Sequence, residues 1–401
     1  MKKLLVICQT LPFPPDGGSK IRSFNVFKEL SEMFEIHLLA FYRRKQGFHQ
    51  QDIGAAVEGL RPVAHTEAFP IAQEGSTWRW VKDHTLSVLS GRVYTASTFR
   101  SAEVLARLRS LLDEQDFHAV HLDSLDLAVY RPEISGVPVT CTHHDAQSLL
   151  LARRAEVQGN PLVRSYMRHQ SRLMEREERR WCPAMECNFT VSEGDARTLQ
   201  SLAPDARFEV IPNGVDTDYF SPAPDAAEGI VFVGGTSWYP NRDALEFYSE
   251  SIRPLLDKVG VEDVTSWVGR IRQEEVTRYQ ADSRLRLTGY VPDVRPYLAG
   301  AACYVVPIRV GGGTRVKILD AWAMGKAVVS TSVGAEGLKA IDGENILIRD
   351  EPLQFARAVK EVLSDGSLRR RLGEGARSTA VEEYSWERIG AKIRTIYGAI
   401  V

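Results

Sequence analysis

Short apolar runs alternate with segments of helical periodicity along the first half of the chain. The runs are rich in β-branched and aliphatic residues, which is typical of buried strands, and they lie at 3–8, 36–41, 119–122, 137–141, 187–191 and 209–211. The segments between them predict helices at 19–33, 104–114, 163–181 and 194–202, with two weaker helices within 78–89. Alternation of this kind is typical of a parallel sheet with helices on both faces.

The alternation breaks at 211–225, where Pro, Gly and Asp cluster as they do in linkers. It then starts again, with strands predicted at 230–233, 265–268, 286–288, 304–307 and 327–330, and with helices from 241, near 273–280, at 316–324 and on to the end. We therefore predict two doubly wound, Rossmann-like α/β domains that face each other across a cleft, in which the ligand binds. The predicted parts are a first domain at 1–212, a linker at 213–228, a second domain at 229–384, and a C-terminal helix at 385–401 that returns to the first domain.

The composition is that of a globular protein, and it excludes several classes of function. With 401 residues, of which 44% are hydrophobic and 25% charged, the chain is long enough for two or three domains and too apolar for disorder. Fifty Lys and Arg against 52 Asp and Glu leave a net charge of −2, which argues against a nucleic-acid binder. No apolar stretch is long enough to cross a bilayer, and the run at 3–8 is too short for a signal peptide.

The five cysteines are scattered and mostly lie within apolar runs. This pattern predicts buried free thiols in a reducing cytoplasm. Only Cys182 and Cys187 lie near each other in the sequence, and they lack two further ligands at a recognisable spacing, so we expect no metal site.

Two glycine-rich segments lie between a predicted strand and a predicted helix. In the first, Gly17 and Gly18 begin a predicted helix, where unpaired backbone amides form a site for an anion. The alternative is a tight turn in which the glycines serve only to adopt positive φ. The second places Arg315 and Lys317 in the first turn of a helix, directly after Gly311, Gly312, Gly313 and Thr314. Two cations beside such amides suit a diphosphate, and Asp320 suits hydroxyls such as those of a ribose. The alternative is a surface helix with ordinary charges.

A series of short motifs, spread over nearly the whole chain, resembles the retaining glycosyltransferases of family 4. The motifs lie at 14–18, 142–145, 191–193, 211–216, 232–234, 289–291, 306–326 and 384–386, in the order found in that family. The Gly-Gly-Gly-Thr-Arg-x-Lys run resembles a subset similar to bacterial exopolysaccharide transferases. The resemblance implies a GT-B fold and a nucleotide-diphosphate sugar as co-substrate, with no other cofactor and no metal.

The resemblance also assigns roles to individual residues. It implies catalytic roles for His144, Arg315 and Lys317, and a sugar or acceptor contact for His143 and Asp145, although a histidine here is also read as structural. The implied donor-binding residues are Gly17, Gly18, Arg270, Tyr290, Val291, Gly311, Gly312, Gly313, Thr314, Asp320 and Glu336. The donor phosphate would accept the acceptor's proton, so no protein general base is assigned.

The chain departs from the family pattern at two places. The family usually has two glutamates eight positions apart, and Gly312 and Asp320 stand there in this chain; Glu336 is expected to replace the first glutamate. The loop at 234–241 lacks the family's Arg and Lys, so Arg315 and Lys317 are expected to hold the diphosphate instead.

The predicted helix at 163–181 is strongly basic. Residues 164–180 hold six arginines and three glutamates, and Arg164, Arg168, Arg172 and Arg176 recur every four residues as one stripe. A solvated helix face is the simplest interpretation. The alternative is contact with an anionic membrane surface or with an acceptor that carries phosphate.

The patterns predict a two-domain α/β protein with a diphosphate site, and the resemblance implies a retaining hexosyltransferase that uses a UDP- or GDP-sugar and acts in cell-surface glycan or glycoconjugate synthesis. Its acceptor would be a glycan, a lipid-linked saccharide or a small molecule, and its location the cytoplasm or the inner face of the membrane. Two alternatives stay open: a GT-B epimerase or phosphorylase, and a nucleotide-sugar binding protein without catalytic activity.

Overall fold

The computed structural model describes residues 1–43, 50–71, 82, 84–85, 87, 91–156, 158–222, 228–311 and 316–401. The chain forms two compact units, of which the first comprises Met1–Pro212 with Gly390–Val401 and the second Asn213–Ile389. The first division falls where the Pro-rich break was predicted. The second falls between Ile389 and Gly390 rather than at residue 385, and the described part of the expected linker belongs to the second unit.

A seven-stranded parallel sheet forms the centre of the first unit, with strand order β3-β2-β1-β4-β5-β6-β7. The strands are β1 (Lys2–Cys8), β2 (Phe34–Tyr42), β3 (His65–Pro70), β4 (Ala119–Leu122), β5 (Val139–His143), β6 (Cys187–Thr190) and β7 (Phe208–Val210). The strand order reverses between β1 and β4, so the crevice for a ligand is expected at the carboxyl ends of these two strands.

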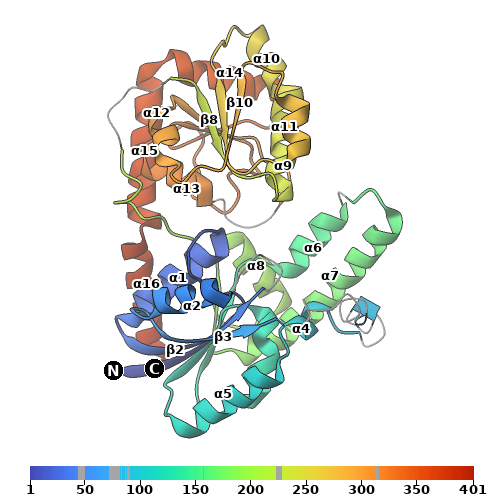
Figure 1. The fold of residues 1–401 in the computed structure, drawn as a ribbon, viewed down its shortest axis with the longest axis vertical. Coiled ribbons are helices and arrows are strands. Elements are labelled where there is room, and N and C mark those ends of the chain that lie inside the picture. The colour runs from blue at the N-terminus through green and yellow to red at the C-terminus, as the bar shows by residue number, and fades with distance from the viewer. Residues whose placement is uncertain are drawn as a thin grey trace. The chain divides into compact units, whose positions relative to one another are not determined.

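The helices of the first unit cover both faces of this sheet (Figure 1). They are α1 (Gly18–Ser31), α2 (Gln50–Leu60), α4 (Thr95–Thr98), α5 (Ala102–Glu114), α6 (Gln147–Glu156), α7 (Pro161–Trp181) and α8 (Glu193–Leu202), with 3₁₀ segments at Leu125–Glu133 and Cys182–Ala184. Side-chain caps fix several starts: Ser101 accepts from the amide of Val104, and Asn160 accepts from the amides of Leu162 and Val163. The helices expected within 78–89 lie largely outside the described residues.

The second unit contains a six-stranded parallel sheet of order β10-β9-β8-β11-β12-β13. Its strands are β8 (Ile230–Val233), β9 (Thr265–Val268), β10 (Leu285–Gly289), β11 (Cys303–Val306), β12 (Val328–Ser330) and β13 (Leu347–Ile348). Its helices are α9 (Tyr239–Phe247), a π-helical turn at Tyr248–Ile252, α10 (Arg253–Lys258), α11 (Gln273–Tyr279), α12 (Arg295–Gly300), α13 (Val316–Ala323), α14 (Pro352–Ser364) and α15 (Gly366–Tyr384). The last helix, α16 (Trp386–Ile400), begins in this unit and continues into the first.

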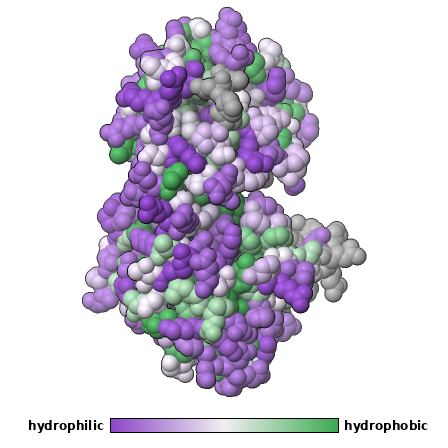
Figure 2. Space-filling model, turned by 90° about the vertical axis from the view of Figure 1, so that its left-hand side faces the viewer, coloured by the Kyte–Doolittle hydropathy of each residue, from purple (hydrophilic) through white to green (hydrophobic). Residues whose placement is uncertain are grey.

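The buried strands hold the apolar core of each unit, while the face shown in Figure 2 is mostly hydrophilic, with hydrophobic residues in small groups. In the second unit, Trp267 stacks on Phe232 with ring centres 3.9 Å apart. The five cysteines are all buried and free, as their scattered positions predicted.

The end of the chain is part of the core of the first unit. Tyr397 is 1% exposed, and its hydroxyl lies 2.8 Å from Thr140 Oγ1 and 3.1 Å from His121 Nδ1. Lys392 Nζ donates to the carbonyl of Val210 at 2.8 Å, and Arg394 pairs with Glu29. Residues 390–401 therefore complete a domain whose other residues precede position 213.

We predict that Tyr397→Ala destabilises the protein by about 3–5 kcal/mol, because it removes a fully buried aromatic ring together with the hydrogen bonds of its hydroxyl. Tyr397→Phe should cost only about 1–2 kcal/mol, since it removes the hydroxyl alone. Thr395→Ala, at an exposed position of the same helix, is the control and should stay within about 0.5 kcal/mol of the parent. Urea unfolding measures all three, and a Tyr397→Ala protein with the parent's midpoint would contradict the assignment.

Candidate functional site

Three glycines at the carboxyl ends of β8 and β9 let the backbone and two polar side chains approach one another closely. A Cβ on Gly269, whose φ is +140°, would lie 2.8 Å from the carbonyl carbon of Gly234 and the amide nitrogen of Gly235. A Cβ on Gly234 would lie 2.6 Å from Asn241 Nδ2 and 2.7 Å from Lys317 Nζ. Any larger residue at Gly234 would therefore displace the lysine or the asparagine.

Lys317 lies in the first turn of α13, with its ammonium held at the end of β8. Its Nζ donates to Asn241 Oδ1 at 2.5 Å and lies 4.3 Å from the centre of the Phe232 ring. The Asn241 side chain is itself fixed, because its Nδ2 donates to the carbonyl of Gly235 at 2.8 Å and the residue is 5% exposed. The ammonium thus has a defined place beside the start of a helix, where an anion is favoured.

The loop that leads from β11 toward α13 is anchored on two sides. Arg309 forms two hydrogen bonds with the carboxylate of Asp243, at 2.9 and 3.2 Å. Thr331, directly after β12, donates from its hydroxyl to the carbonyl of Ile308 and accepts from the amide of Gly334 at 2.9 Å. Gly311 has a φ of +119°. Four predicted site residues, Gly312, Gly313, Thr314 and Arg315, lie outside the described residues.

Asp320 lies one turn after Lys317 on the same helix and is only partly exposed. Removal from water raises the pKa of its carboxyl to about 7, although the nearby charge of Lys317 acts in the opposite direction. The buried hydroxyl of Tyr304 also has a pKa raised by burial and by the charge of Asp320. Near neutral pH, therefore, Asp320 changes between a carboxylate that accepts hydrogen bonds and an acid that also donates one.

Arg270 and Tyr290 follow the next two strands, β9 and β10. The Arg270 guanidinium lies 4.9 Å from the centre of the Tyr290 ring, and Tyr290 is 66% exposed. The backbone of Arg270 accepts from the amide of Thr236 at 2.9 Å, which joins its loop to the one after β8. The structure thus brings Arg270, Tyr290, Lys317 and Asp320 to one edge of the second sheet, with Val291 partly buried next to Tyr290.

Glu336 lies half-buried in the turn after β12.

The first unit has its own polar cluster, centred on a carboxylate that the sequence did not single out. Asp123 directly follows β4 and is 2% exposed. Ser23 Oγ donates to its Oδ2 at 2.5 Å, the Cys8 thiol does so at 3.1 Å, and His144 Nε2 lies 3.6 Å from its Oδ1. The cluster therefore lies at the carboxyl ends of β1, β4 and β5, where the strand order reverses.

Asp123 and His144 each favour the charged form of the other. Burial alone would raise the pKa of Asp123, but the charge of His144 and hydrogen bonds from His121 and His144 hold that pKa well below its usual range. Burial would likewise lower the pKa of His144, yet Asp123 raises it above its ordinary value. His144 Nε2 also lies 2.8 Å from the main-chain oxygen of Asp123, which fixes the orientation of the ring.

His143, for which a sugar or acceptor contact was predicted, belongs to the core. It is 3% exposed, its Nε2 lies 2.9 Å from Asn188 Oδ1, and burial lowers its pKa to about 4, so the ring is neutral. The two neighbouring histidines have different partners, since His143 contacts Asn188 of β6 and His144 contacts Asp123 directly after β4. A buried ring bonded to Asn188 gives no support to the predicted sugar contact. Asp145 is partly buried in the turn before α6.

Gly17 and Gly18 lie at the start of α1, where Gly17 is the N-cap residue with an extended backbone. Neither glycine has positive φ, so a turn that requires it does not account for them. A Cβ on either glycine would meet no atom within 4 Å, which leaves open space above the first amides of the helix. That space is compatible with the predicted anion site.

The described residues contain no group of three or more His, Cys, Asp or Glu side chains placed to hold a metal ion. Within the same part of the chain, no helix is both long enough and apolar enough to span a bilayer.

Comparison with known proteins identifies both units. Residues 17–219 match the family model described as Glycosyltransferase Family 4, and residues 227–365 match the model described as Glycosyl transferases group 1. The chain is 38% identical over 108 residues to the lipopolysaccharide core biosynthesis glycosyltransferase LpsE of Rhizobium meliloti, a match that covers 26% of this chain and 32% of LpsE. It is 26% identical over 321 residues to the phosphatidyl-myo-inositol mannosyltransferase of Mycobacterium leprae, covering 75% of this chain and 78% of that enzyme.

Solved structures show the same fold. The Anabaena protein HepE, determined in complex with UDP, has a TM-score of 0.69 and 15% identity, with 99% of this chain and 100% of HepE covered. The complex of HepE with UDP-glucose has a TM-score of 0.66 and 14% identity, with 99% of each chain covered. With a family model that spans 203 of the 401 residues, and with two Rossmann-like units of the GT-B type, the chain belongs to glycosyltransferase family 4.

Proposed function

We propose that the chain transfers a hexose from a UDP- or GDP-sugar to an acceptor hydroxyl, with retention of the anomeric configuration, in the synthesis of a cell-surface glycan or glycoconjugate. The observation that carries the proposal is the Lys317 ammonium, which Asn241 holds over Gly234 at the start of α13. The family resemblance supports the retention. The HepE complexes, which contain UDP and UDP-glucose, support a uridine nucleotide as the first donor to test.

The second unit offers a partner for each part of the donor. Lys317 and the amides at the start of α13 would neutralise the diphosphate, whose negative charge grows as the bond to the sugar breaks. The carboxylate of Asp320 would accept hydrogen bonds from the ribose hydroxyls. The exposed Tyr290 ring and the adjacent backbone of Val291 would contact the base. With this ammonium and these amides in place, the departure of the diphosphate would not require a metal ion.

The first unit would supply His144 to the sugar or to the acceptor. Asp123 keeps the imidazole oriented through Nε2, and this leaves the other ring nitrogen, Nδ1, to face a substrate. A positively charged imidazole would donate a hydrogen bond to a sugar hydroxyl or a phosphate oxygen. Asp123 would be a positioning residue, because it would act by orienting His144.

Lys317→Ala should lower kcat by roughly 10²–10³-fold, with a smaller change in the KM for the donor, because the charge of Lys317 matters most in the transition state. Asn241→Ala should lower kcat less, because it frees the ammonium without removing it. Lys360→Ala, at an exposed position of α14, is the matched control. The kcat of all three variants is measured as the release of UDP from UDP-glucose in the presence of an extract of glycan and lipid acceptors. Parent-like kcat in Lys317→Ala at saturating donor would refute this role.

The same assay separates the proposed transfer from its alternatives. A transferase converts UDP-glucose to a product that contains the acceptor, whereas an epimerase changes the donor sugar in the absence of any acceptor. A protein that binds UDP-glucose and converts it under neither condition would be a binding protein.

The pKa of Asp320, about 7, predicts a pH-dependent affinity for the donor. UDP-glucose should bind more weakly as the pH falls below about 7, by up to tenfold per pH unit, because protonation removes a hydrogen-bond acceptor. Asp320→Asn should bind weakly at every pH and lose this dependence. Calorimetry with UDP-glucose measures the effect, because the diphosphate diester keeps its charge over this range.

The stability of the unliganded protein gives an independent check on Asp320. A pKa that is higher in the folded than in the unfolded state means that the group stabilises the fold at low pH, and that this contribution is lost as the pH rises through about 7. Asp320→Asn should therefore raise the Tm relative to the parent more at about pH 8 than at about pH 5.5. A constant difference in Tm across this range would show that the carboxyl titrates normally.

Asp123→Asn should lower the pKa of His144, because it removes the negative charge that stabilises the imidazolium. The donor-dependent kcat should fall and its pH profile should shift to lower pH. NMR titration of the histidine rings measures the change directly, and His143 is the internal control because its lowered pKa arises mainly from burial. An unchanged His144 pKa in Asp123→Asn would rule out the pairing.

A further inference from the structure

Helices α6 and α7 form a hairpin that projects from the body of the first unit (Figure 1). The turn between them contains Asn160, whose side chain caps α7, and Pro161, which begins it. Leu162 follows and is 80% exposed, and Val163 is 39% exposed. The hairpin thus presents two large apolar side chains at its tip, where neither contributes to the core.

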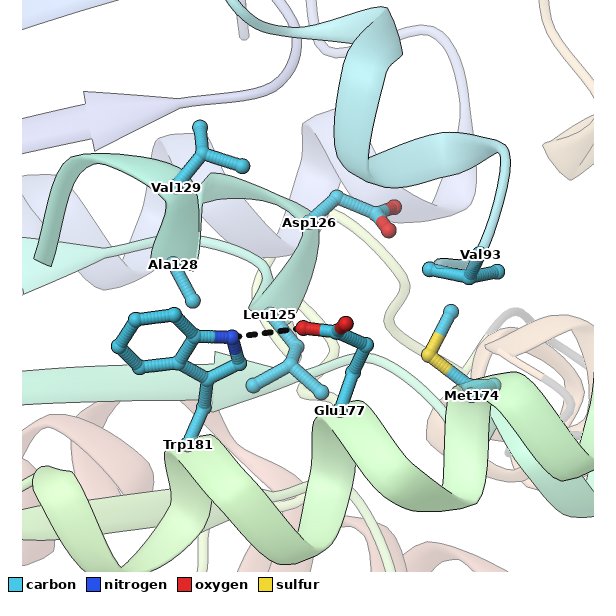
Figure 3. A pocket seen from close by; sticks show the side chains of 8 residues that line it. All are labelled: Val93, Leu125, Asp126, Ala128, Val129, Met174, Glu177 and Trp181. Atoms are coloured by element: carbon cyan, nitrogen blue, oxygen red, sulfur yellow. Dashed lines mark hydrogen bonds between the residues drawn. The ribbon is translucent and has the colours of Figure 1, made fainter. Parts of the chain in front are cut away.

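The inner face of α7 is fully engaged with the rest of the first unit. Figure 3 shows Met174, Glu177 and Trp181 pointing from α7 toward the 3₁₀ segment at Leu125–Glu133, around a pocket of about 20 Å³ that has room for one water molecule. Trp181 Nε1 donates to Glu177 Oε2 at 2.8 Å. Glu178 is 1% exposed and accepts from the amide of Ser148 at 3.1 Å. Two of the three glutamates of this helix therefore accept hydrogen bonds within the first unit.

The arginines, in contrast, lie on the outer face. Arg168, Arg172, Arg176 and Arg179 are exposed, and at 100° per residue they fall within one arc of about 80°, opposite the buried Gln170, Leu173 and Met174. Within the described parts of the chain, Arg168, Arg172 and Arg176 form no hydrogen bond or ion pair through their side chains. Glu175, partly exposed, is the one acidic residue beside this arc on α7.

From this arrangement we infer that the outer face of α7, defined by Arg168, Arg172, Arg176 and Arg179, docks on an anionic lipid bilayer, with Leu162 inserted at the tip. A row of cations about 16 Å long on a straight helix matches a flat anionic surface. Basic side chains attract such a surface, and apolar side chains beside them enter its boundary. The inference does not depend on the proposed transferase activity.

The test is co-sedimentation of the full chain with vesicles of phosphatidylcholine that contain about 30% phosphatidylglycerol. The parent should bind these vesicles, should not bind pure phosphatidylcholine, and should be released at about 0.5 M salt. The triple variant Arg168→Ser, Arg172→Ser, Arg176→Ser should partition on the order of 100-fold more weakly, about fivefold for each lost charge. Leu162→Ser should weaken binding without changing its dependence on salt.

A matched control removes the same charge from the second unit. Arg357, Arg370 and Arg371 are exposed on α14 and α15, and their triple replacement by Ser should leave vesicle binding at the parent level. Equal losses in both triple variants would overturn the inference, since net charge alone would then explain binding. Absence of parent binding to anionic vesicles would overturn it too, and binding to heparin under those conditions would assign the face to a soluble polyanion. Binding of UDP-glucose by the α7 variant, measured in parallel, tests the donor site separately.

Discussion

The placement of one ammonium group at the carboxyl edge of the second sheet depends on most of the structure around it. Lys317 Nζ lies 2.5 Å from Asn241 Oδ1 and over the ring of Phe232. The position is open only because residue 234 has no side chain. Asn241 in turn is held by the carbonyl of Gly235, and the loop before α13 is tied to Asp243 and to Thr331. In the proposed role, a charge fixed in this way would meet the diphosphate without reorganisation.

Two carboxylates with opposite pKa shifts give the two units different electrostatic properties. Asp123 is buried among donors and stays ionised, so that it stabilises the charge of His144. Burial disfavours the charged form of Asp320 and raises its pKa to about 7, while the charge of Lys317 acts in the opposite direction. In the first unit the carboxylate therefore favours the charged form of a histidine, while the second unit holds a carboxyl that titrates near neutral pH.

Much of the fold could be predicted from the sequence, because a buried parallel strand requires an uninterrupted apolar run. The strands at 230–233 and 265–268 have the predicted bounds. The edge strand His65–Pro70 was missed, since its partly exposed residues include polar ones, and the two-residue β13 was too short to leave a pattern. The C-terminal helix was expected to return to the first domain from residue 385, whereas residues up to 389 belong to the second unit, because a continuous helix carries no local mark of a domain boundary.

The residues of the candidate site that the sequence named all lie in or beside recognisable short motifs. Lys317 and Asp320 were identified beside the glycine run. Asn241 lies 76 positions before Lys317, and nothing in its local sequence distinguishes it from an ordinary residue after a proline. Asp123 escaped notice for a similar reason, since only the strand order brings it to His144. The burial of His143 was not predicted, because a motif match does not reveal which side chains of a strand are buried.

The most direct test of the central claim is a crystal structure of the protein with UDP-glucose. The account predicts a diphosphate oxygen within about 3 Å of Lys317 Nζ, at the start of α13, with the ribose hydroxyls on Asp320. A nucleotide bound with its diphosphate on Arg270 alone, while Lys317 remains apart from it on Asn241, would contradict the account.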